Sequence, residues 1–179
     1  MGIELDIVIA LNTSRTMLKP IRDRRGIDIV IEHTQTLLNE LSKLNSRVGL
    51  IVFSKNAYPL IDLTNNIEKV KELLRYLRIF GPYPDIINAI RESIYMFLNY
   101  WDEYSSKYII IVPEIESYRV RELEYVINLA LTYNIKIINL VLLTTSHKAL
   151  SKLMNLQNRG IIIVQGVKEL LKVLTKTYT

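Results

Sequence analysis

The sequence predicts an α/β fold, namely a three-layer α/β/α sandwich with a doubly wound, mostly parallel six-stranded sheet and one antiparallel edge strand. Short apolar runs typical of buried strands alternate along the whole chain with amphipathic segments of helical period. The 179 residues, of which 49% are hydrophobic, suffice for one domain with a sizeable core. No linker or internal repeat argues for a second domain, so residues 1–179 are expected to form a single one.

Six strands are expected. The first lies at residues 4–11 and contains a continuous apolar run, which is typical of a central strand in a parallel sheet. Residues 57–61 follow the strand at 47–53 after a short turn, so these two strands form an antiparallel hairpin. The remaining strands are expected at residues 108–112, 136–143 and 161–164.

Six helices are expected between and after the strands. Apolar residues recur within them at the three- and four-residue spacing of a buried helix face. Thr64 or Asn65 can cap the second helix, and Asp85 lies at or near the start of the third. The expected helical ranges are 27–44, 65–78, 85–99, 119–133, 148–157 and 167–175.

Short oxygen-bearing side chains follow the first strand. Asn12, Ser14 and Thr16 come directly after its last apolar residue. In doubly wound sheets the functional crevice lies at the carboxyl ends of the strands, so these side chains stand where this class of fold binds ligands. The alternative interpretation is that they satisfy loop amides and cap a turn, as such residues commonly do.

Three segments resemble the von Willebrand factor A domain family. Asn12-Thr-Ser-Arg-Thr16 is similar to the family's metal-ion-dependent adhesion motif, Asp-x-Ser-x-Ser, with Asn in place of the first Asp. Arg47–Ser54 resembles the family's second strand, and Leu60–Thr64 resembles the segment that leads into its second helix. The order of the elements matches too, so the resemblance covers nearly the whole chain and implies the family's Rossmann-like fold.

The resemblance also implies a divalent cation held by three loops. In the family the first loop supplies Asp, Ser and Ser, the second supplies Thr and the third supplies Asp. The nearest positions here are Asn12, Ser14, Thr16, Pro84 with Asp85 beside it, and Glu114. Mg²⁺ prefers near-octahedral oxygen geometry and one or two carboxylates. This degenerate set therefore predicts either no cofactor or weakly bound Mg²⁺ or Mn²⁺.

A basic segment lies on the rim of the expected crevice. It holds five cations against a single Asp: Arg15, Lys19, Arg22, Arg24 and Arg25. A solvated loop is the simpler interpretation. The alternatives are a docking surface for an acidic protein or for a nucleic-acid backbone. Because the net charge is only +5, we rank nucleic acid below a protein partner.

Two aromatic features are candidates for partner binding. Tyr83 lies between two prolines in a rigid loop, and we predict that it is central to partner binding together with Arg15. Alternatively, Tyr83 packs down and fills the space of a metal and its Thr ligand. At the end of the third helix, Trp101 with Tyr100 and Tyr104 either caps the sheet or exposes an interaction patch.

An enzymatic function is not expected. The chain has no cysteine, which excludes a thiolate nucleophile and a zinc–thiolate site. Its two histidines, His33 and His147, lack the spacing of metal ligands, and the turn after the first strand contains no Gly for a dinucleotide. We therefore assign no catalytic residue.

Location and source are inferred from composition. No apolar run reaches the roughly 18 residues that span a bilayer, and the early first strand leaves no room for a signal peptide. We expect a cytoplasmic protein, and abundant Ile, Lys and Tyr without Cys suggests a thermophilic archaeon. The resemblance, with its degenerate ion motif, implies a scaffold subunit of an intracellular complex. The alternatives are a cation-dependent ligand-binding domain and a nucleic-acid-associated subunit of a transcription or repair complex.

Overall fold

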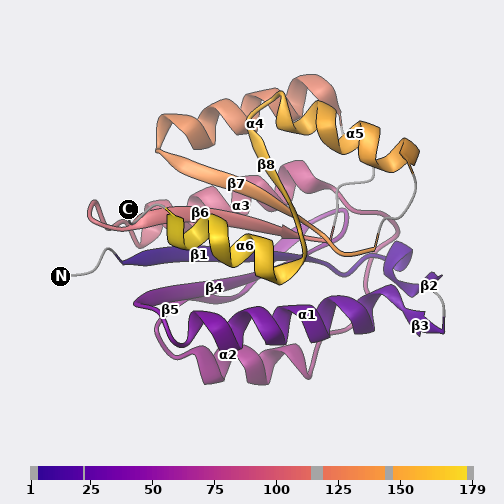
Figure 1. Ribbon diagram of the computed structural model, residues 1–179, viewed down its shortest axis with the longest axis horizontal. Helices are drawn as coiled ribbons and strands as arrows, with labels where there is room; N and C mark the ends of the chain where they lie inside the picture. The colour runs from indigo at the N-terminus through magenta and orange to yellow at the C-terminus, as the bar shows by residue number, and fades with distance from the viewer. Residues whose placement is uncertain (1–3, 22, 114–118, 144–146, 177–179) are drawn as a thin grey trace.

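The computed structural model describes residues 4–21, 23–113, 119–143 and 147–176 (Figure 1). Within these residues six strands form one sheet in the order β5-β4-β1-β6-β7-β8. The strands are β1 (Leu5–Asn12), β4 (Ser46–Phe53), β5 (Ala57–Thr64), β6 (Ser106–Val112), β7 (Ile135–Val141) and β8 (Ile161–Gln165). Neighbouring strands are parallel except β4 and β5, which pair antiparallel at one edge. The predicted sheet is therefore confirmed.

Helices cover both faces of the sheet (Figure 1). One core joins the sheet to α1 (Gly26–Leu41), α2 (Ile67–Leu74) and α6 (Gly166–Thr175). A second core joins the opposite face to α3 (Ile86–Asn99), α4 (Val120–Thr132) and α5 (His147–Gln157). The three-layer sandwich is the predicted architecture.

Strand β1 is buried on both faces of the sheet. All eight of its residues are buried. Ile7 and Ile9 enter the α1 core, whereas Val8 and Ala10 enter the α3 core, as the alternation of side chains along a strand requires. A strand with two apolar faces has no place at an exposed edge, so β1 lies in the middle of the sheet.

The segment between β1 and α1 differs from the expected loop. It forms a short 3-10 helix, η1 (Arg15–Leu18), followed by a small antiparallel pair, β2 (Pro20–Ile21) and β3 (Arg24–Arg25). Met17 is buried in this segment, and a Cβ added to Gly26 would lie 3.0 Å from its methyl group. The small residue at the start of α1 thus lets Met17 anchor the segment to the core.

The start of α2 also corrects the prediction. Thr64 still belongs to β5, so it is not the cap, and neither is Asn65. The cap is Asn66, whose Oδ1 accepts a hydrogen bond from the Lys69 amide at 3.1 Å. The helix ends at Leu74 rather than near residue 78. The local sequence holds three consecutive residues that can cap a helix, and the length of β5 decides between them.

Candidate functional site

The loops at the carboxyl ends of β1 and β4 are joined to the loop before α3 by backbone hydrogen bonds. The Thr13 amide donates to the Phe53 carbonyl at 2.8 Å, and the Phe80 amide donates to the Thr13 carbonyl at 2.8 Å. The Asp85 amide donates to the Ser54 carbonyl at 2.8 Å. Three loops that are distant in sequence therefore form one connected surface, which we call the upper site.

Gly81 allows the close approach of two of these loops. Its φ of +67° lies in the left-handed region, which side chains other than Gly rarely adopt. A Cβ at this position would lie 2.2 Å from the Ser54 Oγ and 2.7 Å from its Cβ. Both the backbone conformation and the available space therefore require glycine.

The three predicted ligands of the first loop do come together, but they bind one another. Asn12 Oδ1 accepts a hydrogen bond from the Ser14 amide at 2.9 Å. The hydroxyls of Ser14 and Thr16 are hydrogen-bonded at 2.8 Å, and Ser14 is fully buried. These contacts match the interpretation in which short polar side chains stabilise a turn.

Asp85 is likewise engaged by the protein. Its Oδ1 accepts a hydrogen bond from the Ile87 amide at 3.0 Å and caps α3, as the sequence predicts. Its Oδ2 lies 3.1 Å from the Arg119 guanidinium, which also pairs with Glu122 at 2.8 Å. Nothing in the sequence near Asp85 indicates Arg119, because the two residues are 34 positions apart on different elements.

The described residues of the upper site do not fit a divalent cation. Asn12, Ser14 and Thr16 supply neutral oxygens only, and the one described carboxylate, that of Asp85, already binds a guanidinium. Over the described part of the chain, no buried side-chain polar atom lacks a hydrogen-bond partner, and no three His, Cys, Asp or Glu residues cluster as metal ligands. Glu114, the remaining predicted ligand, lies outside the described residues.

The basic segment is partly neutralised by α1. Arg24 pairs with Glu32 at 2.5 Å, and Arg25 binds both carboxylate oxygens of Asp28 at 2.8 Å. The hydrogen bonds from Arg25 hold the pKa of the Asp28 carboxyl below its usual range. Arg15 and Lys19 are exposed and form no ion pair within the described residues, whereas Arg22 lies outside them. Two of the five predicted cations are therefore paired with acids of α1.

A cavity of about 570 Å³ opens beside the upper site between the β4–β5 turn, the start of α3 and Arg119. Tyr83 and Lys55 line it together with Asp85, and the side chain of Tyr83 is 51% exposed. Asn88 joins two of its walls by donating to the Lys55 carbonyl at 2.9 Å. Tyr83 is thus half exposed and forms part of the cavity wall.

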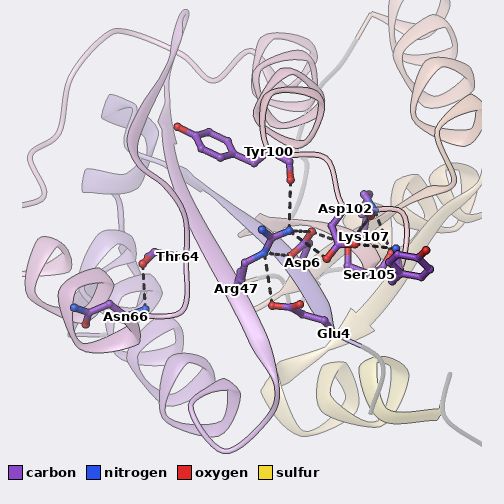
Figure 2. A network of polar contacts seen from close by, with 10 residues as sticks. Glu4, Asp6, Arg47, Thr64, Asn66, Tyr100, Asp102, Ser105 and Lys107 are labelled. Atoms are coloured by element: carbon purple, nitrogen blue, oxygen red, sulfur yellow. Dashed lines mark hydrogen bonds and ion pairs between the residues drawn. The ribbon is translucent and has the colours of Figure 1, made fainter. Parts of the chain in front are cut away.

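A second polar cluster lies at the opposite end of the sheet (Figure 2). In the strand register, Asp6 on β1 stands opposite Arg47 on β4 and Lys107 on β6. The fully buried Asp6 carboxylate binds Arg47 through two hydrogen bonds of 2.7 and 2.6 Å, and Ser105 donates to it at 2.6 Å. Sequence reasoning missed this cluster, although a charged residue near the start of each of three apolar strands could have indicated it.

The two cations of this second cluster have pKa values shifted in opposite directions. The hydrogen bonds with Asp6 raise the pKa of the Arg47 guanidinium above its ordinary value. Burial lowers the pKa of the Lys107 amine, which donates to the carbonyls of Asp102 and Ser105. The cluster joins three central strands to the segment that precedes β6. All its described buried polar atoms are satisfied, which is typical of a structural network.

The fold and the upper site define a class: a doubly wound α/β domain whose candidate site lies on loops at the carboxyl ends of its strands. Within that class the chain belongs to the von Willebrand factor type A domain family, whose sequence profile matches residues 7–112. Members of this family are interaction modules that mediate protein–protein contacts and are typically non-catalytic.

Solved structures agree with this fold. The chain is similar to BatB from Bacteroides thetaiotaomicron, with 18% identity, 96% of each chain covered and a TM-score of 0.71. An aerotolerance-related membrane protein from Bacteroides fragilis is 16% identical over 96% of this chain and 97% of its own, with a TM-score of 0.71. The SpRpn10 VWA domain is 15% identical, with 90% of this chain and 87% of that domain covered and a TM-score of 0.70. At these identities the similarity establishes the fold alone.

None of the curated proteins compared with the chain resembles it significantly. Among the described residues, no helix is both long enough and apolar enough to cross a bilayer.

Proposed function

We propose that this domain is a non-enzymatic interaction module that binds a protein partner through the upper site. The observation that carries the proposal is the half-exposed residue Tyr83, which lines a cavity and belongs to a loop joined to its neighbours by backbone hydrogen bonds. A ring fixed in this way loses little entropy on binding, and Tyr is enriched among residues that dominate binding energy. The neighbouring cation Lys55, with Arg15 nearby on η1, can add charged contacts.

Two features support a binding role over a catalytic one. The hydroxyls of Ser14 and Thr16 are hydrogen-bonded to each other, whereas an activated nucleophile needs a base. The family also consists typically of non-catalytic interaction modules. We extend the proposal to a scaffold subunit of an intracellular complex, in which binding requires no divalent cation.

The pairing of Arg24 and Arg25 with acids of α1 favours a protein over a nucleic acid as the partner. Phosphate binding depends on cations that are free to replace counterions, and here two of the predicted five are already neutralised. A nuclease-resistant interaction is therefore expected.

The test is partner capture from native extract, with crosslinking and mass spectrometry, after nuclease treatment. The wild-type chain is compared with Tyr83→Ala and with Tyr125→Ala, a control in which an exposed Tyr of α4 is removed. We expect a defined partner whose recovery falls about tenfold or more with Tyr83→Ala, as for an interface hot spot, and is unchanged in the control. Equal recovery by both variants, or no protein partner, contradicts the proposal.

A further inference from the structure

A second aromatic surface lies at the end of the molecule opposite the upper site. The segment between α3 and β6 carries Tyr100, Trp101 and Tyr104, which we call the lower surface. Trp101 is 47% exposed and Tyr104 is 80% exposed. The rings are partly exposed, as an interaction patch requires, and Trp101 also packs on Lys107 of β6 and on Tyr133.

The backbone of the segment that carries the lower surface is bonded to the polar cluster around Asp6, whose contacts Figure 2 shows. Lys107 donates to the carbonyls of Asp102 and Ser105, and the Ser105 hydroxyl donates to Asp6 at 2.6 Å. The Tyr104 amide also donates to Asp102 Oδ1 at 2.9 Å. Rings on a backbone anchored in this way require little further ordering when a partner binds.

The cations near the rings are engaged by the buried cluster, whereas two acids beside the rings are exposed. The cations Arg47 and Lys107 point into the cluster, where they are bonded to Asp6 and to backbone carbonyls. The acids lie further out: Glu103 is exposed, and the exposed Asp62 accepts a hydrogen bond from the Tyr100 hydroxyl at 2.9 Å. A partner that approaches this surface therefore meets aromatic rings and negative charge.

The Trp101 ring already binds one cation within the chain. The Lys107 ammonium lies 4.2 Å from its centroid, and Tyr133 meets the ring edge-on with centroids 6.1 Å apart. Cation–π attraction is strongest for Trp and also operates for Tyr, and the Arg guanidinium forms it most often. Because Lys107 already occupies the Trp101 ring, the ring that stands open to a cation of a partner is that of Tyr104.

We propose that the lower surface docks an arginine-bearing segment of a protein partner, by stacking on the exposed ring of Tyr104 and pairing with the adjacent Glu103. Arginine is favoured over lysine because its planar guanidinium can stack on a ring and bind a carboxylate at the same time. This surface is separate from the upper site, so the inference does not depend on how that site binds.

The test uses the single Trp of the chain as a local reporter. The full chain is titrated with a fluorescein-labelled peptide of alternating Gly and Arg, and with versions that carry Gln or Glu in place of Arg. Peptide anisotropy gives the affinity, and Trp101 emission reports binding at this surface. We expect saturable binding of the Arg peptide only, with a change in Trp101 emission and an affinity that falls as salt rises.

Two variants locate the binding. Tyr104→Ala removes an exposed ring and Glu103→Gln removes an exposed charge. Each is expected to lower the affinity for the Arg peptide about fivefold, the effect of one exposed cation–π contact or one exposed ion pair. Tyr125→Ala and Glu72→Gln change exposed residues of α4 and α2 and serve as matched controls with no expected effect. Absence of binding, equal binding of the Gln peptide, or binding unaffected by the first two variants overturns the proposal. Self-association that changes Trp101 emission without peptide would identify a second copy as the occupant and also overturn it.

Discussion

At the scale of single residues, Asn12 is the first difference between the upper site and the metal site of the family. Asn12 carries an amide where the family motif has a carboxylate, and its oxygen accepts the Ser14 amide. A neutral first ligand, with two hydroxyls that bind each other, offers little to an ion that must lose tightly held water. The local hydrogen bonds are complete without a cation.

We therefore predict that Mg²⁺ or Mn²⁺ at about 10 mM leaves the melting temperature of the wild-type chain unchanged relative to EDTA, because a ligand that does not bind cannot stabilise. Calorimetric titration is the direct measurement. Asn12→Asp restores the carboxylate and is expected to create weak binding. Saturable binding by the wild-type chain, lost in Ser14→Ala, would show instead that the native site holds a cation.

At the scale of elements, the upper site depends on how closely its loops can approach. The loop before α3 reaches the β4–β5 turn through Gly81, and Asp85 then begins α3. The 3-10 helix η1 is joined to the same loop, because the Arg15 amide donates to the Gly81 carbonyl at 3.1 Å. The position of Tyr83 is therefore set by contacts between elements rather than by its own segment.

Gly81→Ala is predicted to destabilise the chain by more than the roughly 1–2 kcal/mol that a left-handed backbone costs a residue with a Cβ. The additional cost comes from the clash with Ser54. Gly166→Ala is the matched control, since Gly166 also has a positive φ of +76° but an added Cβ meets nothing within 4 Å. Urea unfolding compares the two, and equal losses of stability would refute the steric argument.

At the scale of the whole molecule, the two ends of the sheet differ in structure. The carboxyl ends of the strands support the upper site, and the amino ends of β1, β4 and β6 are joined by the cluster around Asp6. Because β1 lies between β4 and β6, the Asp6–Arg47 pair is anchored in the centre of the sheet. Its loss should affect the stability of the entire fold.

Arg47→Met is predicted to lower the free energy of unfolding by about 3–5 kcal/mol, because it removes the guanidinium that binds both oxygens of the buried Asp6 carboxylate. The double variant Asp6→Asn with Arg47→Met removes the charge as well and is expected to recover a large part of the loss. Urea unfolding of both variants is the measurement. If the double variant is as unstable as the sum of the two single variants, the pair does not act as a unit.

The sequence by itself determined the order of strands and helices, the antiparallel hairpin and the family. These follow from the period of apolar residues and from local motifs, and both are properties of neighbouring positions. The grouping of Asn12, Ser14 and Thr16, and the cap at Asp85, were predictable for the same reason.

The tertiary structure alone decided which side chains from distant elements meet. It brought Arg119 to Asp85 and joined Asp6 to Arg47 and Ser105. No local pattern encodes these contacts, because the partners lie 34, 41 and 99 positions apart and meet only through the packing of the whole sheet. For that reason the residues that give both surfaces their charge could be read only from the folded chain.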